Sequence, residues 1–163
     1  MKGATPLDQT AVQAGQMAPD FTLPRDGGGS VTLSDLCGGK VVLYFYPKDN
    51  TPGCTVEALD FTAAVADFAA AGTTILGISK DSVKKHENFV KKQSLGIALL
   101  SDEQGRTCED YGVWGEKSMY GKLFMGIERA TFLIGADGTV LQVWRKVKVP
   151  GHVAEVLAAA KSA

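Results

Sequence analysis

The sequence predicts an α/β fold, with a central mixed β-sheet and helices on both of its faces. Short apolar segments alternate with helical patterns through the first two thirds of the chain, an order that is typical of parallel strands connected by helices. Further on, an Asp137-Gly138 pair joins two strand-like segments and predicts an antiparallel hairpin. The 163 residues, 45% of them hydrophobic, suit one domain with a single core.

The first expected element is a small hairpin. Residues 21–23 and 31–33 are short apolar segments, and the glycine-rich residues 27–30 between them suit a turn. Ahead of the hairpin, residues 1–17 are predicted to be an N-terminal extension that could be flexible. Residues 18–163 are predicted to form the single domain.

The central strand and the helix after it are the clearest elements. Residues 40–46 are a continuous β-branched and aromatic segment that ends at Pro47, as expected for a strand buried on both faces. A helical pattern follows and ends at Gly72. Its apolar positions recur at steps of four and three residues: Cys54, Ala58, Phe61, Val65 and Phe68. Cys54 is therefore expected at the start of this helix, on its apolar side.

The remaining elements continue the alternation and then close the sheet. We expect, in order, a strand at 73–79, a helix capped by Asp81 that runs through Lys92, a strand at 97–100, a short helix at 102–111, two hairpin strands at 130–135 and 139–144, and a closing helix at 152–161.

Charge and composition exclude several classes of protein. The 17 Lys and Arg residues against 18 Asp and Glu provide no overall field for nucleic acid or an anionic membrane. No segment reaches the ~20 apolar residues of a membrane-spanning helix, and the N-terminus lacks a signal-peptide pattern. We therefore expect a soluble, cytoplasmic protein. The three cysteines are too few for a disulfide scaffold, and their odd number leaves at least one thiol unpaired within the chain.

Cys54 has the sequence context of a reactive thiol. It opens a helix directly after a loop that contains proline and glycine. Free amide groups and the helix dipole at such a position favour thiolate over thiol, which makes the sulfur both a nucleophile and a target of oxidation. The alternative from position alone is a small buried hydrophobic residue, because free cysteine is often buried.

The segment around Cys54 resembles the active-site stretch of peroxiredoxins. The family pattern Pro-x-x-x-Thr-x-x-Cys falls on Pro47, Thr51 and Cys54. Residues 18–23, 111–117 and 126–134 also resemble segments of one branch, called peroxiredoxin Q or bacterioferritin comigratory protein. The resemblance runs from about Ala18 to the C-terminus and implies a thioredoxin fold.

The resemblance implies a thiol-dependent peroxidase that reduces hydrogen peroxide and organic hydroperoxides without a bound cofactor or metal. Cys54 would be the peroxidatic cysteine and would pass through a sulfenic acid. Thr51 would be its hydroxyl partner, Pro47 the shield of the pocket and Arg129 the guanidinium that holds substrate and thiolate. The amides of Gly53 and Cys54 would point into the same substrate-binding space.

The sequence departs from the family where the resolving cysteine is expected. Many members of this branch carry one five residues after the peroxidatic cysteine, where Leu59 stands here, and residues 83–93, the second known place, hold no cysteine. Cys37 and Cys108 are the remaining candidates. We favour a one-cysteine mechanism, with thioredoxin, glutaredoxin or a low-molecular thiol as the external reductant. Members of this branch are often monomers, and we expect a monomer.

Other functions remain as alternatives. Cys54 oxidation could serve a redox sensor or a thiol-dependent binding protein with little turnover. A disulfide oxidoreductase is disfavoured because there is no Cys-x-x-Cys pair, and a Cys-His hydrolase would need His86 or His152 beside Cys54. Glu57 either joins the hydrogen bonds of the site or only complements the helix dipole, and Tyr44 either lines the pocket or packs in the core.

Overall fold

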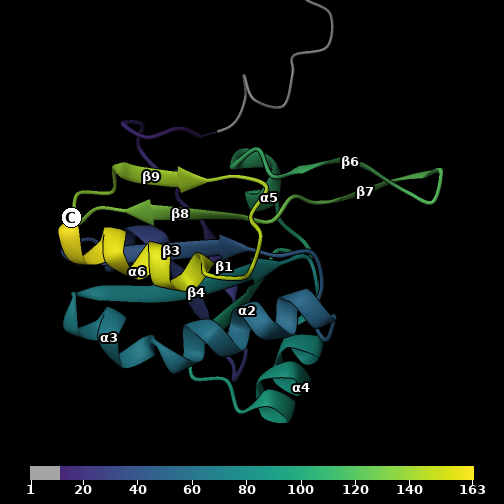
Figure 1. Ribbon diagram of the computed structural model, residues 1–163, viewed down its shortest axis with the longest axis horizontal. Helices are drawn as coiled ribbons and strands as arrows, with labels where there is room; N and C mark the ends of the chain where they lie inside the picture. Colours follow the sequence, from purple (N-terminus) through teal and green to yellow (C-terminus); the bar gives the residue numbers. More distant parts are fainter. Residues whose placement is uncertain (1–11) are drawn as a thin grey trace, which may run out of the picture.

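The computed structural model describes residues 12–163 and is built on one five-stranded sheet (Figure 1). The strands follow in the order β5-β4-β3-β8-β9. Their bounds are β5 (Ala98–Ser101), β4 (Thr73–Ser79), β3 (Lys40–Phe45), β8 (Ala130–Ile134) and β9 (Val140–Trp144). The first three strands are mutually parallel and β8 and β9 are antiparallel to their neighbours, so the predicted mixed sheet is confirmed.

The side chains of β3 divide the core between the two faces of the sheet. Val41, Leu43 and Phe45 belong to one hydrophobic cluster, and Val42 and Tyr44 belong to the other. Successive residues of a strand point to opposite faces, so a strand with five consecutive buried apolar residues, as at 41–45, must be covered on both faces. The prediction of a strand buried on both faces is therefore confirmed.

Helices cover both faces of the sheet, but unequally. The face of Val42 and Tyr44 packs against four helices: α2 (Pro52–Ala63), α3 (Val65–Ala70), α4 (Val83–Gln93) and α6 (His152–Ser162). The other face is covered by smaller elements: the hairpin of β1 (Thr22–Pro24) and β2 (Ser30–Thr32), the 3-10 helix η1 (Leu33–Leu36) and α5 (Thr107–Asp110). None of the helices within residues 12–163 is long and apolar enough to cross a bilayer.

Three helix boundaries differ from the prediction. The helix expected to end at Gly72 is interrupted at Ala64 and forms α2 and α3, although alanine itself is a strong helix former. Ser82, not Asp81, caps α4 by accepting a hydrogen bond from Lys85 N, because the Asp81 carboxylate binds the Asp49 amide and the Ser79 hydroxyl instead. The helix expected from residue 102 shortens to α5.

A second hairpin, formed by β6 (Trp114–Met119) and β7 (Lys122–Ile127), was not predicted. It projects from the end of the molecule toward which β3 runs (Figure 1). Met119 pairs with Lys122, so Tyr120 and Gly121 form a two-residue turn in which both φ angles are positive, 54° and 78°. Such turns usually carry Asn-Gly or Asp-Gly, and a tyrosine at the first position conceals the hairpin in the sequence.

The described part of the predicted N-terminal extension lies along β9. Gly15 N donates to Val140 O at 2.8 Å, Val140 N donates to Gln16 O at 2.8 Å, and Val12 is buried. These contacts cover one end of the β9 edge. Residues 1–11 lie outside the described part of the chain, and the boundary between extension and domain stays a prediction.

Candidate active site

Cys54 lies in the first turn of α2, directly beyond the end of β3. Pro52 occupies the first helical position, where its fixed φ suits the helix and its missing N–H costs no hydrogen bond. Cys54 is only 1% exposed and belongs to the hydrophobic cluster beneath α2. The predicted placement of Cys54 at the start of a helix and on its apolar side is therefore confirmed.

The Arg129 side chain joins Cys54 to Glu57. Its Nη2 donates to Cys54 Sγ at 3.3 Å and its Nη1 donates to Glu57 Oε1 at 2.6 Å. Arg129 immediately precedes β8, and the pairing of Ala130 with Phe45 brings it to the end of β3 where α2 begins. A Cβ atom on Gly53 would lie 3.3 Å from Arg129 Nη2, so a glycine at this position leaves room for the guanidinium.

Thr51 and Pro47 lie in the loop that precedes α2, and both are half-buried. The Thr51 hydroxyl donates to the Lys48 carbonyl at 2.9 Å, while the Thr51 carbonyl accepts from the Thr55 amide and hydroxyl. The structure thus places Thr51 at the start of the helix with its hydroxyl turned to the loop backbone. Pro47 directly follows the last core residue of the strand region, Tyr46.

Two buried polar groups stand beside Cys54 and Arg129. Burial raises the pKa of Glu57 to about 7, although the Arg129 cation opposes this shift. Burial, followed by the charges of Glu57 and Cys54, raises the pKa of the Tyr44 hydroxyl. Tyr44 Oη and Glu57 Oε2 have no hydrogen-bond partner among the described residues. A carboxyl oxygen without a donor is the natural carrier of a proton, which agrees with the raised pKa of Glu57.

Glu57 therefore makes folding stability depend on pH. The pKa of Glu57 in the folded protein lies above its ordinary value of 4.5, so the stabilisation that Glu57 contributes to the folded state is fully present below about pH 4.5. This stabilisation is lost as the pH rises through 7. We expect the free energy of unfolding of the wild type to fall, relative to Glu57→Gln, by about 2–3 kcal/mol between pH 5 and pH 8. Urea unfolding of both proteins at the two pH values measures this difference.

The matched control is Glu103→Gln, which changes an exposed carboxylate in the same way. Its difference from wild type should stay nearly constant over the same pH range. A constant difference for Glu57→Gln as well would show that Glu57 titrates with an ordinary pKa.

A second polar cluster braces the loop before α2. Asp49 binds three groups: its Oδ1 accepts from the Tyr46 hydroxyl at 2.6 Å, its Oδ2 lies 2.7 Å from His86 Nδ1, and its amide donates to Asp81 Oδ2 at 2.8 Å. His86 Nε2 lies 2.9 Å from the Leu100 carbonyl and must donate to it. Asp49, Asp81 and His86 carry ligand atoms close enough together to hold a metal ion, but these atoms already bind protein groups. Their contacts tie the loop to α4 and β5.

The other two cysteines lie away from Cys54. Cys108 is fully buried in the cluster on the opposite face of the sheet, and burial next to Asp102 raises its pKa. Cys37 is exposed and precedes the start of β3, whereas Cys54 follows its end. The structure brings neither cysteine to the site. His152 binds the Thr131 hydroxyl at 2.8 Å, and His86 belongs to the cluster around Asp49.

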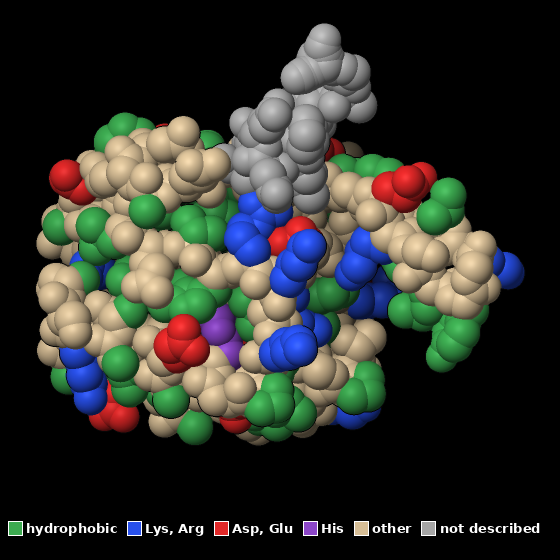
Figure 2. All heavy atoms as spheres, turned by 45° about the horizontal axis from the view of Figure 1, so that its top comes forward, with side chains coloured by type: hydrophobic (Ala, Val, Ile, Leu, Met, Phe, Trp, Pro, Cys, Tyr) green, Lys and Arg blue, Asp and Glu red, His purple; other side chains and the backbone are tan. Residues whose placement is uncertain are grey.

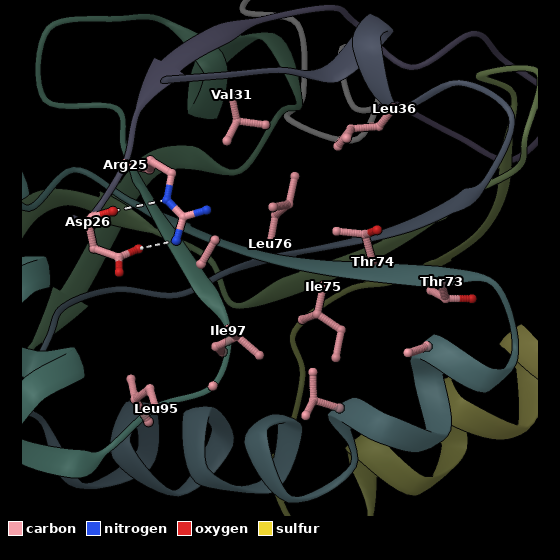
Figure 3. Close-up of a pocket in the computed structure, with 14 residues that line it drawn as sticks. Arg25, Asp26, Val31, Leu36, Thr73, Thr74, Ile75, Leu76, Leu95 and Ile97 are labelled. Atoms are coloured by element: carbon pink, nitrogen blue, oxygen red, sulfur yellow. Dashed lines mark hydrogen bonds and ion pairs between the residues drawn. The ribbon is translucent and has the colours of Figure 1, made fainter. Parts of the chain in front are cut away.

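A cavity of about 580 Å³ lies where β4 and β5 begin, at the end of the sheet away from Cys54 (Figure 3). Ile75, Leu95 and Ile97 give the cavity an apolar lining. At the edge of the cavity the Arg25 guanidinium binds the carbonyl and carboxylate of Asp26. Neither Cys54 nor Arg129 lines it. The Cys54 sulfur therefore has a separate environment, which combines burial, the Arg129 cation and the start of a helix.

This combination of fold and site defines a class, the thiol-dependent oxidoreductases with a thioredoxin fold. A family model described as AhpC/TSA matches residues 14–143. The chain is 54% identical to a putative peroxiredoxin Bcp of Coxiella burnetii, over 90% of this chain and 97% of that protein. The peroxiredoxin Bcp of Bacillus subtilis is 49% identical, over 90% and 93%.

The solved structures agree. One that concerns the alkyl peroxide reduction activity of the bacterioferritin comigratory protein of Xanthomonas campestris matches with a TM-score of 0.85 at 49% identity, covering 91% of this chain and 98% of that one. The chain belongs to the AhpC/TSA family and, within it, to the Bcp or peroxiredoxin Q branch of the peroxiredoxins. Its resemblance to this branch and its thioredoxin fold are thereby confirmed.

The sequence alone leaves the role of Glu57 undecided and gives no indication of the cluster around Asp49. The signal for Glu57 was its position three residues after Cys54, which places both side chains on one side of the helix. Asp49, Asp81 and His86 gave no comparable signal, because their meeting depends on how parallel strands align at the end of the sheet.

Proposed function

We propose that this peroxiredoxin reduces hydrogen peroxide and organic hydroperoxides at Cys54. The observation that carries the proposal is the 3.3 Å contact from Arg129 Nη2 to Cys54 Sγ, in a site where Cys54 as a residue is 1% exposed. A guanidinium that touches the sulfur holds hydrogen-bond donors where charge develops on the peroxide oxygens. The alkyl peroxide activity named for the Xanthomonas campestris relative supports the inclusion of organic hydroperoxides.

The first half-reaction needs only groups of this site. The Cys54 thiolate attacks one peroxide oxygen, an S–O bond forms, and the O–O bond breaks. Cys54 is oxidised to sulfenic acid, and the other oxygen leaves as hydroxide or alkoxide and takes up a proton from solvent water to become water or alcohol. Arg129 and the amides of Gly53 and Cys54 stabilise the departing charge, while Thr51 offers a hydroxyl that can donate and accept, once it turns from Lys48.

Pro47 and Glu57 act on this site without reacting. Pro47, half-buried and without an N–H, shields the pocket from water. Glu57 positions the guanidinium through its 2.6 Å bond to Arg129 Nη1. Tyr44 belongs to the packing beneath α2, where its ring stacks on Phe61 at 4.5 Å between centroids.

We further propose that the sulfenic acid is resolved by an external thiol. A disulfide requires Cα atoms within about 7 Å. Cys108 is separated from Cys54 by the sheet itself, and Cys37 by the length of β3, about 16 Å for its six residues. Leu59 and the residues of α4 supply no other thiol. Thioredoxin, glutaredoxin or a low-molecular thiol is the proposed reductant, and the cytoplasm and the monomeric state stay predictions.

The intact mass after one equivalent of peroxide distinguishes the two mechanisms. We expect a gain of one oxygen, mapped by peptides to Cys54, because neither of the other thiols lies within bonding distance. A loss of two hydrogens, mapped to Cys54 with Cys37 or Cys108, would refute the one-cysteine mechanism. The Cys37→Ser variant is the control, since it should give the same mass change as wild type.

A peroxide sensor with little turnover is the second candidate, and the burial of Cys54 is the observation that favours it. A thiol can reach the sulfur of a cysteine that is 1% exposed only after the surrounding chain moves, which would slow the reduction of oxidised Cys54. Steady-state turnover with thioredoxin, glutaredoxin and dithiothreitol decides between the two. Repeated turnover with any donor supports the enzyme, whereas one equivalent of peroxide consumed per protein with every donor supports the sensor.

A further inference from the structure

The β6–β7 hairpin concentrates the exposed apolar surface of the molecule. Five of the nine large hydrophobic side chains that are exposed in the described residues lie on it. These five form the hairpin patch: Met119 (57% exposed), Tyr120 (96%), Leu123 (67%), Phe124 (42%) and Met125 (53%). Strand alternation places Met119 and Phe124 on the face that carries Lys117, and Leu123 and Met125 on the other face, so the hairpin patch surrounds the hairpin. Exposed apolar residues gathered on one projecting element mark an interaction surface, because leaving them in water is unfavourable.

A basic groove connects the base of this hairpin to the active site. It has a volume of about 440 Å³, and its charged lining includes Lys117, Lys146, Lys148 and Arg129, the residue that binds Cys54. Glu128, which also lines it, is paired with Arg145 at 2.8 Å, and Glu116 is the other acidic residue. Figure 2 shows Lys and Arg side chains gathered between the main body and the projecting hairpin, which carries hydrophobic side chains.

We propose that the hairpin patch and the basic groove form the docking surface for a protein reductant, one whose exposed thiol pair is surrounded by apolar and acidic side chains. The inference rests on the proposed function, because a sulfenic acid without a resolving partner in its own chain needs a second molecule. The first thiol of the reductant attacks Cys54 sulfenic acid, forming a mixed disulfide and releasing water. Its second thiol attacks that disulfide, which returns Cys54 as a thiol and leaves the reductant oxidised.

The shape and charge of the surface select this occupant. A small thiol would contact the groove alone and leave the projecting patch uncovered, whereas a protein can cover both. A second copy of this chain, related by a two-fold axis, would bring two basic grooves into one interface, and like charges oppose that contact. Acidic residues beside the reductant's thiols would instead be attracted to Lys146 and Lys148, which are both exposed.

The test compares a protein donor with a small dithiol. Peroxide turnover is measured with a bacterial thioredoxin, its reductase and NADPH, and separately with dithiothreitol. For the Leu123→Ser/Phe124→Ser variant we expect the KM for thioredoxin to rise about tenfold, the usual effect of removing interface anchors, with unchanged turnover on dithiothreitol. Leu141→Ser is the matched control, because Leu141 is an exposed leucine (43%) on β9, and it should leave both unchanged.

A charge variant tests the groove independently of the hairpin's fold. Lys148→Glu should raise the KM for thioredoxin about tenfold at low salt and less at high salt, because screening weakens the attraction it removes. Unchanged KM values for both variants would overturn the inference. Equal losses with thioredoxin and dithiothreitol would also overturn it, since the residues would then act on the site itself.

Three further outcomes distinguish a failure of the docking surface from a failure of the proposed peroxidase function. Wild-type turnover with dithiothreitol, but with neither thioredoxin nor glutaredoxin, would overturn the docking surface and leave the peroxidase intact. A wild-type dimer in sedimentation analysis that Leu123→Ser/Phe124→Ser converts to monomers would assign the patch to a second copy instead. Failure of the wild type to turn over with any thiol would refute the proposed function, together with the inference that rests on it.

Discussion

Replacing Cys54 by serine is expected to abolish peroxide consumption. Serine occupies nearly the same volume and can still accept a hydrogen bond from Arg129, so the variant should fold around an almost unchanged site. Its oxygen cannot be oxidised by the peroxide, however, and remains protonated near neutral pH. The rate of peroxide consumption should fall by a factor of about 10³ or more, as is usual when a nucleophile is removed. Stopped-flow or electrode measurement of peroxide loss provides the readout.

The matched controls remove the other two thiols. Cys37→Ser changes an exposed residue, and Cys108→Ala avoids placing a hydroxyl in the core where Cys108 is buried. Both variants should keep peroxide consumption within a small factor of wild type with dithiothreitol as donor. Rapid consumption by Cys54→Ser would remove Cys54 from the reaction. Loss of turnover in Cys37→Ser or Cys108→Ala alone, with rapid first-turnover oxidation retained, would make that cysteine the resolving residue.

The fold was largely predictable where local pattern and final environment agree. Residues 41–46 and 75–78 carry no polar or charged side chain apart from the tyrosine hydroxyls because the sheet buries both faces of their strands, and β3 and β4 occur there. The β6–β7 hairpin was not predictable, since its exposed strands lack regular alternation and Tyr120 takes the turn position usual for Asn or Asp. The interruption at Ala64 has no local cause in the sequence either.

The site was predictable to the extent that it is local. The placement of Cys54 follows from a buried strand, a loop and a helix start within one short segment. Arg129 was assigned through family resemblance, because its approach to Cys54 requires β8 to pair with β3, a contact between distant parts of the chain. The cluster of Asp49 and His86 depends in the same way on how β3, β4 and β5 end together. Long-range pairing of this kind leaves no periodic pattern in the sequence.

Arg129→Lys is expected to slow the oxidation of Cys54 although it preserves the positive charge. The guanidinium donates to Cys54 Sγ and Glu57 Oε1 at once, through two nitrogens held in one plane. A lysine ammonium is a single point of charge on a flexible chain and cannot hold both partners in that geometry. We expect the second-order rate with hydrogen peroxide to fall about 10²-fold for Arg129→Lys, and by about 10³-fold for Arg129→Gln, which also removes the charge.

The two Arg129 variants separate charge from geometry. If Arg129→Lys keeps the wild-type rate while Arg129→Gln loses it, the field of the cation suffices and the planar arrangement has no part in the rate. If both keep it, Arg129 is only a structural partner of Glu57. Arg145→Lys, which alters a half-buried arginine paired with Glu128, is the matched control and should leave the rate unchanged. Because Arg129 contacts the Cys54 sulfur and Arg145 contacts Glu128 and Gly112 instead, only a catalytic role of Arg129 predicts the ordered loss in the Arg129 pair alone.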